Sequence, residues 1–249
     1  MLSEQMLKVA SYNIHKCVGT DRRRNPGRTI DVLNELDADI VALQEADRRF
    51  GARAAAIPSL LLEQNSDYLA VPLDVQTDSM GWHGNAILVR KSANINMHDI
   101  VHIPCLEPRG AIVAKIETGG MELVIWGMHL DISGLWRRRQ ASAIEKLARE
   151  HGRDMPTVLM GDLNEWRPSG GCLKDFGRSY NFAPCGRSFH ARGPVAELDR
   201  IMHCDRIKLI DCGVFESPSA RKASDHLPIW AKLEIVATQF SPVNLEAHP

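Results

Sequence analysis

The sequence has no long apolar segment and no excess of positive charge. Its 249 residues carry a net charge of −1, so no overall basic field attracts nucleic acid or an anionic membrane. No stretch approaches the roughly 20 apolar residues of a membrane-spanning helix. We therefore expect no stable membrane insertion, and only the basic clusters at residues 21–24 and 136–140 are left as candidate phosphate contacts.

Cysteine pairs and a signal peptide are also missing. The six cysteines are scattered without a C-x-x-C pair, and a chain of this size does not need disulfides, so we expect reduced thiols. A zinc site using residues 202–205 with Cys185 and Cys212 would lack the usual ligand spacing. The N-terminal residues lack the charge and apolar stretch of a signal peptide. A cytoplasmic protein is expected.

Short apolar runs separated by turn residues make up most of the chain. Residues 7–14 and 39–45 are typical of buried strands, and between them Ile30, Leu33 and Leu36 recur at near-helical spacing. This first unit is predicted to be β-α-β.

Four strand-like runs follow in the middle of the chain, at residues 84–91, 95–103, 109–118 and 121–130. Gly119-Gly120 is a strong signal for a two-residue hairpin, and we expect the four runs to form an antiparallel meander. Further elements are predicted in the second half: helices at 135–151 and 170–177, and strands at 156–162, 198–204, 208–216 and 226–236.

The mixture of β-α-β units and hairpins predicts an α/β protein with two packed sheets and helices outside them. No repeat or Pro/Gly-rich linker interrupts residues 7–236, so residues 1–236 are expected to form a single domain. Residues 237–249 show no periodicity and are expected to be a mobile C-terminal tail.

Polar residues that can bind a metal or a phosphate terminate almost every predicted strand. They are Asn13, Glu45, His83, Asn85, Arg109, His129, Asp162, Asn164, Asp199, Asp225 and His226. Any one of them alone would be read as a turn or cap residue, but a sheet can bring all of them to one rim. Carboxylate and amide oxygens without thiolates favour Mg²⁺ or Mn²⁺ over zinc.

Sequence signatures of competing chemistries are absent. There is no nucleophile elbow, phosphate-binding P-loop, dinucleotide fingerprint or H-E-x-x-H zinc motif. Ser224, Asp225 and His226 are consecutive, so they can hardly form a catalytic relay with one another. Hydrolysis by a metal and an activated water molecule fits best.

Seven motifs now carry a resemblance: SYNI, LQE, GNAIL, MHLD, GDLN, LDRIM and SDHLP, in this order from Leu7 to about Val236. The sequence resembles the endonuclease/exonuclease/phosphatase superfamily, which includes DNase I-like nucleases, inositol polyphosphate 5-phosphatases and neutral sphingomyelinases. The closest resemblance is to small bacterial metal-dependent hydrolases. It implies a four-layered α/β/β/α sandwich of two packed mixed sheets, and metal-dependent cleavage of phosphate esters.

The resemblance also implies roles for the motif residues. Glu45 would be the principal metal ligand, with Asn13 and Asp225 close by or bound through water. Asn164 would hold the scissile phosphate, and Asp162 would orient or deprotonate the attacking water.

A second group of roles concerns the imidazoles. His226 would pair with Asp199 at the phosphate, and either Asp162 or His226 could be the general base. His129 stands where abasic-site endonucleases usually carry a tyrosine, which makes such an enzyme a poorer match. The substrate contacts are expected from Asn85, Arg109 and His83.

The sequence therefore predicts a Mg²⁺-dependent phosphodiesterase, with nucleic acid among its candidate substrates. A phosphatase, or a phospholipase-like or sphingomyelinase-like hydrolase of a lipid or sugar phosphate, is the alternative. An inactive binding protein of the same fold is disfavoured because every catalytic position is filled. Glu165 and Trp166 depart from the pattern of the inositol phosphatases, and the oligomeric state is left open.

Overall fold

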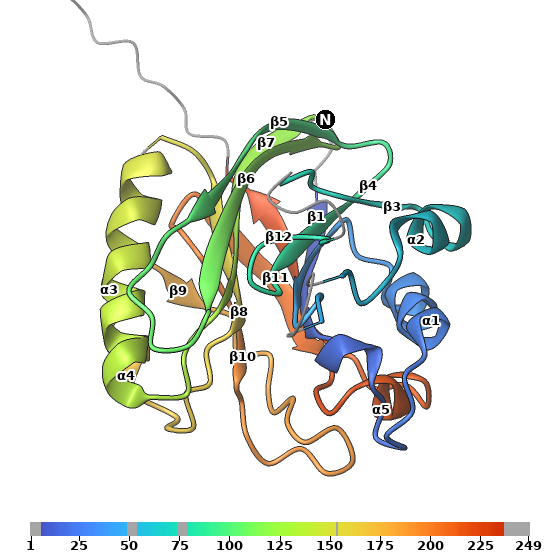
Figure 1. Cartoon of the computed structure of the whole chain (residues 1–249). Helices are drawn as coiled ribbons and strands as arrows, with labels where there is room; N and C mark the ends of the chain where they lie inside the picture. Colours follow the sequence, from blue (N-terminus) through green and yellow to red (C-terminus); the bar gives the residue numbers. More distant parts are fainter. Residues whose placement is uncertain (1–5, 49–53, 74–78, 153, 237–249) are drawn as a thin grey trace, which may run out of the picture.

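The computed structural model describes residues 6–48, 54–73, 79–152 and 154–236. Two six-stranded sheets pack face to face, and helices cover the outer face of each (Figure 1). The architecture is the α/β/β/α sandwich that the resemblance implies. The predicted C-terminal tail, residues 237–249, lies outside the described residues.

The first sheet contains the N-terminal β-α-β unit and the last strand of the chain. Its order is β11 (Ile207–Val214), β12 (Ile229–Ile235), β1 (Met6–Asn13), β2 (Ile40–Gln44), β4 (Ala86–Arg90), β3 (Tyr68–Ala70). β1 and β2 run parallel, while the other neighbours are antiparallel. The predicted β-α-β unit is thus confirmed, and the sheet is mixed.

The second sheet contains the middle of the chain. Its order is β5 (Asn94–Val101), β6 (Gly110–Thr118), β7 (Met121–His129), β8 (Thr157–Asp162), β10 (Asp199–His203), β9 (Asn181–Phe182). Only β7 and β8 run parallel in it. The helix between them therefore crosses over the outer face of this sheet.

The helices lie on the two outer surfaces of the sandwich (Figure 1). α1 (Pro26–Leu36), α2 (Ser59–Asn65) and α5 (Ala220–Ala223) cover the first sheet, and α3 (Gly134–His151) and α4 (Gly171–Phe176) cover the second. A short 3₁₀ turn, η1 (His15–Cys17), follows β1. α1 begins where the Asn25 side chain accepts a hydrogen bond from Arg28 N and Pro26 occupies the first turn, a favourable helix start.

The predicted four-stranded meander is wrong for its first strand. β4 pairs with β2 and β3 in the first sheet, so only β5, β6 and β7 form an antiparallel meander. The hairpin at Gly119-Gly120 is confirmed, with φ values of +57° and +74° that glycine adopts without strain. Apolar runs of equal length do not reveal which sheet a strand joins, and this explains the error.

One hydrophobic core lies between the sheets, and it is built from alternate side chains of their inner faces. Val9 and Ile40 of the first sheet meet Ile112, Ile125 and Met160 of the second in this apolar cluster. Because these side chains are fully buried, the packing holds the strand ends of both sheets in fixed register. The polar residues at those ends are positioned by this core.

The glycine before Asp162 is required by the close approach of β7 and β8. A Cβ added at Gly161 would lie 1.9 Å from the carbonyl oxygen of Met128. We expect Gly161→Ala to lower the free energy of unfolding by about 3 kcal/mol, because backbone rather than a flexible side chain must move. Urea unfolding measures this.

Gly193→Ala is the matched control, because a Cβ there would meet nothing within 4 Å. Equal stability of the two variants would contradict the close approach.

Candidate active site

The polar strand ends lie at one end of the sandwich. Asn13 ends β1 beside the last residue of β2, and Glu45 follows β2 directly. His129 ends β7 and pairs in register with Asp162, the last residue of β8. Both pairs of strands are parallel, so their carboxyl ends coincide, and the packing of the sheets brings the two pairs together.

Asp162 is the centre of these contacts. Its Oδ2 accepts a hydrogen bond from Asn13 Nδ2 at 3.0 Å, across the interface between the sheets. The same oxygen lies 3.4 Å from His129 Nε2 and 3.8 Å from His226 Nε2. Its other oxygen accepts the backbone N–H of Asn164 at 2.9 Å. This carboxylate is only 2% exposed, so its charge is offset by neighbouring donors rather than by water.

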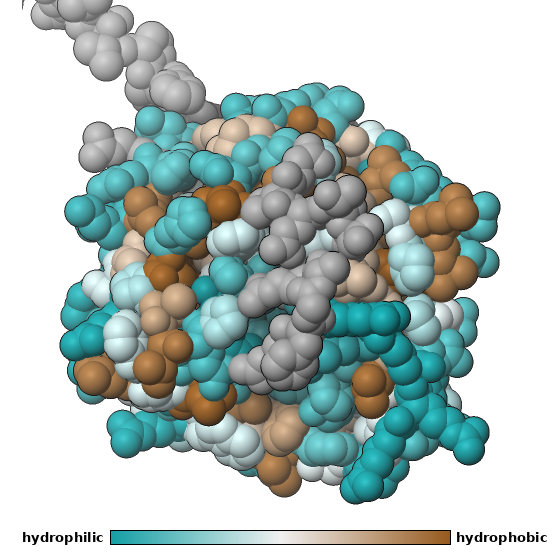
Figure 2. All heavy atoms as spheres, in the orientation of Figure 1, coloured by the Kyte–Doolittle hydropathy of each residue, from teal (hydrophilic) through white to brown (hydrophobic). Residues whose placement is uncertain are grey.

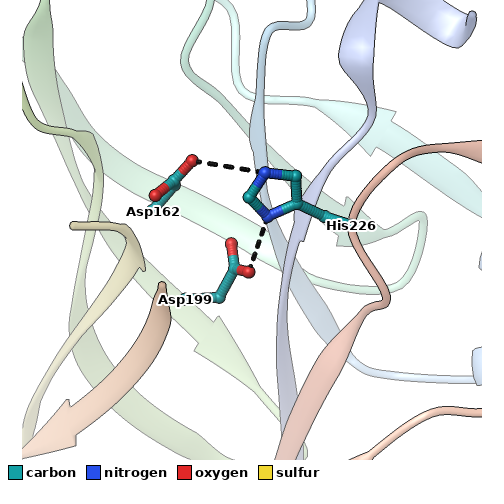
Figure 3. Close-up of side chains that lie close together, drawn as sticks. All are labelled: Asp162, Asp199 and His226. Atoms are coloured by element: carbon teal, nitrogen blue, oxygen red, sulfur yellow. Dashed lines mark hydrogen bonds and ion pairs between the residues drawn. The ribbon is translucent and has the colours of Figure 1, made fainter. Parts of the chain in front are cut away.

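His226, Asp199 and Asp162 form the cluster drawn in Figure 3. His226 Nδ1 lies 2.8 Å from Asp199 Oδ2, and Ser188 Oγ donates to the same oxygen. Burial alone would lower the pKa of His226, but Asp199 and Asp162 together raise it to about 10. His226 is therefore an imidazolium near neutral pH, with Nδ1–H held by Asp199 and Nε2–H facing Asp162.

His129 is the opposite case. Burial and the adjacent Arg109 outweigh the attraction of Asp162 and lower the pKa of His129 to about 3. Arg109 Nη1 lies 2.7 Å from His129 Nδ1 and 2.6 Å from its Nε2, and Nε2 also lies 3.4 Å from Asp162 Oδ2. One carboxylate thus faces a neutral imidazole and a charged one.

A cavity beside this cluster holds Glu45. It is lined by Lys16, Glu45, Asp47, His83, Arg109 and His129, with Gly84 and Pro108. The Lys16 ammonium contacts Glu45 Oε2. Although burial would raise the pKa of Glu45, Lys16, His15 and Arg109 hold it below its usual range. Glu45 is therefore an ionised carboxylate, and the positive charge of Lys16 already lies against it.

Four of these residues have left-handed backbone conformations. The φ values are +58° for Lys16, +54° for Glu45, +49° for His83 and +50° for Asn164. Side chains other than Asn rarely adopt this region, and such outliers cluster at functional sites. The local turns aim these side chains at the cavity and the carboxylate cluster at some conformational cost.

Direct contacts and the shared cavity join nine of the residues predicted from the sequence. They are Asn13, Glu45, His83, Arg109, His129, Asp162, Asn164, Asp199 and His226. The amide Nδ2 of Asn85 is instead used by the carbonyls of Trp82 and Gly110, which fixes the loop beside β6. Asp225 lies 3.7 Å from His15 Nδ1, and no described contact joins it to Glu45.

Three polar residues in the site were not predicted: Lys16, Asp47 and Ser188. Asp47 is only two positions after Glu45. Lys16 is only three positions after Asn13, so its closeness to the SYNI motif is a sequence signal that could predict its place in the site. Ser188 carries no sequence signal, because its contact with Asp199 depends on the path of the loop before β10. Among the described residues, the close-set group of metal-capable side chains is Asp162, Asp199 and His226. It includes no cysteine, and all six cysteines are free.

A family model provides the decisive comparison. The model of the Endonuclease/Exonuclease/phosphatase family matches residues 10–226, which include every strand end described above. The chain belongs to the endonuclease/exonuclease/phosphatase family. Members of this family are hydrolases of phosphate esters and generally depend on divalent metals. A comparison with curated protein sequences gives no match.

Solved structures of the same family have the same fold. A family protein from Bacteroides thetaiotaomicron has a TM-score of 0.72 and 19% identity, covering 93% of this chain and 98% of that one. The human nocturnin catalytic domain with bound sulfate gives 0.70 and 20%, covering 92% and 94%. A mannosyl-6-phosphatase from B. thetaiotaomicron gives 0.69 and 19%, covering 91% and 99%. These identities show a shared fold.

The His226–Asp199 pair predicts a pH-dependent stability difference. The raised pKa of His226 contributes stability that is fully present below its unfolded value of 6.5 and is lost as the pH rises toward about 10. We expect His226→Gln to lower the free energy of unfolding by about 3 kcal/mol below pH 6.5, and by less as the pH rises. Urea unfolding with EDTA present measures the difference.

His98→Gln is the control, because His98 is exposed on β5. A His226→Gln deficit that is constant over this pH range would show that the pair carries no net charge interaction.

Proposed function

We propose that this protein is a Mg²⁺-dependent or Mn²⁺-dependent phosphodiesterase that hydrolyses its substrate by in-line attack of water. The observation that carries the proposal is the buried Asp162 carboxylate, held between Asn13, a neutral His129 and a charged His226. Hydrolysis of a phosphodiester needs a positioned water, charge stabilisation on the phosphate and a proton for the leaving oxygen. This cluster contains a candidate for each task.

The residues around Glu45 fit a hard divalent cation. Glu45 is negative, lines a cavity and already has an ammonium against its carboxylate. Glu45 would hold the metal, and Asn13 and Asp225 would bind it directly or through water. When bound, the metal neutralises phosphate charge and lowers the pKa of a coordinated water molecule.

Asp162 is the proposed general base. The imidazolium His226 has no free lone pair on Nε2, whereas Asp162 is a buried acceptor 3.8 Å from it. The water oxygen would attack phosphorus while its proton passes to Asp162 and the bond to the leaving oxygen breaks. His226 Nε2–H would protonate that oxygen, with Asp199 stabilising the charged ring beforehand.

Phosphate binding would fall to the remaining residues. The Asn164 amide Nδ2, now bonded to the carbonyl of Leu130, would turn to a phosphate oxygen. Arg109 and His83 line the cavity and would contact the same group, while Asn85 would support them through its bond to the Gly110 carbonyl. His129 would hold Asp162 in place.

The proposal also covers the substrate class, the domain and the cellular compartment. Nucleic acid remains a candidate, as D. rerio TDP2 complexed with a single-strand DNA product shares the fold (TM-score 0.71, 17% identity). The phosphatase alternative rests on the mannosyl-6-phosphatase neighbour. The proposed single domain over residues 1–236 is compatible with the family match, which covers residues 10–226. The proposed location in a reducing cytoplasm is compatible with the free cysteines.

Removing the charge of Asp162 should abolish turnover. We expect Asp162→Asn to lower kcat on bis-p-nitrophenyl phosphate by about a thousandfold or more, because the base is lost while the side-chain shape is kept. The control is Asp31→Asn on the exposed face of α1.

The wild-type rate should require Mg²⁺ or Mn²⁺ and vanish in EDTA. Turnover of p-nitrophenyl phosphate without any turnover of the diester would instead favour the phosphatase alternative.

Glu45 should control metal affinity independently of turnover. We expect Glu45→Gln to weaken Mn²⁺ binding by at least about tenfold, because the neutral amide is a poorer ligand for a hard cation. Isothermal titration calorimetry measures this, with Glu63→Gln on α2 as the control. Unchanged Mn²⁺ binding would move the metal site away from Glu45.

A further inference from the structure

Large apolar side chains surround the active-site end of the sandwich and are exposed there. The described residues include nine strongly exposed large apolar side chains. Five of these lie in loops, or in the first turn of α3, next to the site: Leu106 (66% exposed), Ile132 (62%), Leu135 (61%), Trp166 (60%) and Val195 (67%). We call these five residues the apolar rim. An exposed apolar group of this kind indicates an interaction surface.

Three members of the rim are fixed through Asp131, just beyond the end of β7. Asp131 Oδ2 accepts the backbone N–H of Leu106 at 3.2 Å, and Ile132 follows Asp131 directly. Asp131 Oδ1 accepts Ser133 N at 3.0 Å, which leads the chain into α3 and places Leu135 in its first turn. Buried polar contacts therefore hold these apolar side chains outward.

The other two members are fixed through Phe189, which packs on the catalytic histidine. The ring centroids of Phe189 and His226 are 4.9 Å apart, and Trp166 meets Phe189 edge-on at 5.8 Å. Val195 N donates to the carbonyl of Phe189 at 2.7 Å. The apolar rim is therefore joined through Asp131 to the end of β7 and through Phe189 to His226.

Basic side chains stand among the apolar ones. Arg139, Arg167 and Arg192 are exposed. Arg139 lies one turn after Leu135 on α3, and Arg167 and Arg192 belong to the same loops as Trp166 and Val195. Arg192 also bonds to the carbonyl of Thr20, which joins this region to the exposed turn that carries Arg22 and Arg23. In Figure 2, apolar and strongly hydrophilic side chains gather along the lower edge of the face shown.

We propose that the apolar rim docks this protein on an anionic lipid surface and presents a phospholipid phosphodiester to the active site. The inference rests on the proposed function and names its substrate class. Exposed apolar side chains beside arginines match the acyl boundary and the phosphates of a bilayer surface. Four of the five are aliphatic, and aliphatic groups do not provide the stacking surface that single-stranded nucleic acid needs.

The docking would be peripheral. None of the helices among the described residues is long and apolar enough to cross a membrane. The rim side chains come from separate loops, so they would reach only the head-group region. Asp162 and His226 are buried, and Phe189 contacts both His226 and Trp166, so the proposed reaction would take place beside the surface that meets the lipid phosphates.

Vesicle sedimentation tests the proposal. We expect wild-type protein to bind vesicles of equal parts phosphatidylcholine and phosphatidylglycerol more tightly than vesicles of phosphatidylcholine alone, and less tightly as salt is raised. Leu135→Ser and Leu106→Ser should each weaken this binding by about tenfold, since each removes a large side chain from the apolar interface. Leu60→Ser is the matched control, because Leu60 is equally exposed (65%) but lies on α2.

The outcomes separate this inference from the proposed function. Failure of wild type to bind either vesicle, or equal losses in the Leu60 and Leu106 variants, would overturn the docking surface even if bis-p-nitrophenyl phosphate is hydrolysed. Weaker binding of a single-stranded oligonucleotide by the Leu135 and Leu106 variants, without a change in vesicle binding, would identify a nucleic-acid surface instead. Vesicle binding by a protein that hydrolyses no phosphodiester would overturn the proposed substrate and the proposed function together.

Discussion

The hydrogen bond from the Asn13 amide to the Asp162 carboxylate joins the two sheets at the end where their polar residues gather. A carboxylate buried this deeply needs compensating donors, and these come from β1, β7, the turn after β8 and the segment before β12. The apolar core between the sheets holds these elements in register. The contacts of Asp162 therefore depend on the sandwich packing, and any substitution that shifts one sheet against the other would disturb the site before it unfolds the protein.

The two histidines beside Asp162 show how burial assigns different roles to the same side chain. Both are almost fully buried, yet the pKa of one is lowered to about 3 and that of the other raised to about 10. The difference comes from the second neighbour, which is a guanidinium for His129 and a carboxylate for His226. A single carboxylate thus lies between a neutral imidazole and a charged one.

Much of the fold could be read from the sequence because most strands are apolar runs, and those that lead to the site, β1, β7 and β8, end in polar residues. The β-α-β unit, the Gly119-Gly120 hairpin and most strand positions follow from local patterns. Sheet membership does not, and β4 was therefore placed in the wrong sheet. For the site, the motif residues could be named, but Lys16 and Ser188 act through contacts that only the folded loops create. The catalytic roles themselves remain predictions.

The apolar rim shows the limit of sequence reading most clearly. Leu106, Leu135 and Val195 are separated by dozens of residues, and each has the apolar character that ordinarily predicts burial. Their exposure follows from the contacts that fix these loops, because Asp131 accepts the backbone N–H of Leu106 and the carbonyl of Phe189 accepts that of Val195. A surface of this kind forms only when several loops meet around one site, so its chemistry belongs to the assembled rim and not to any single motif.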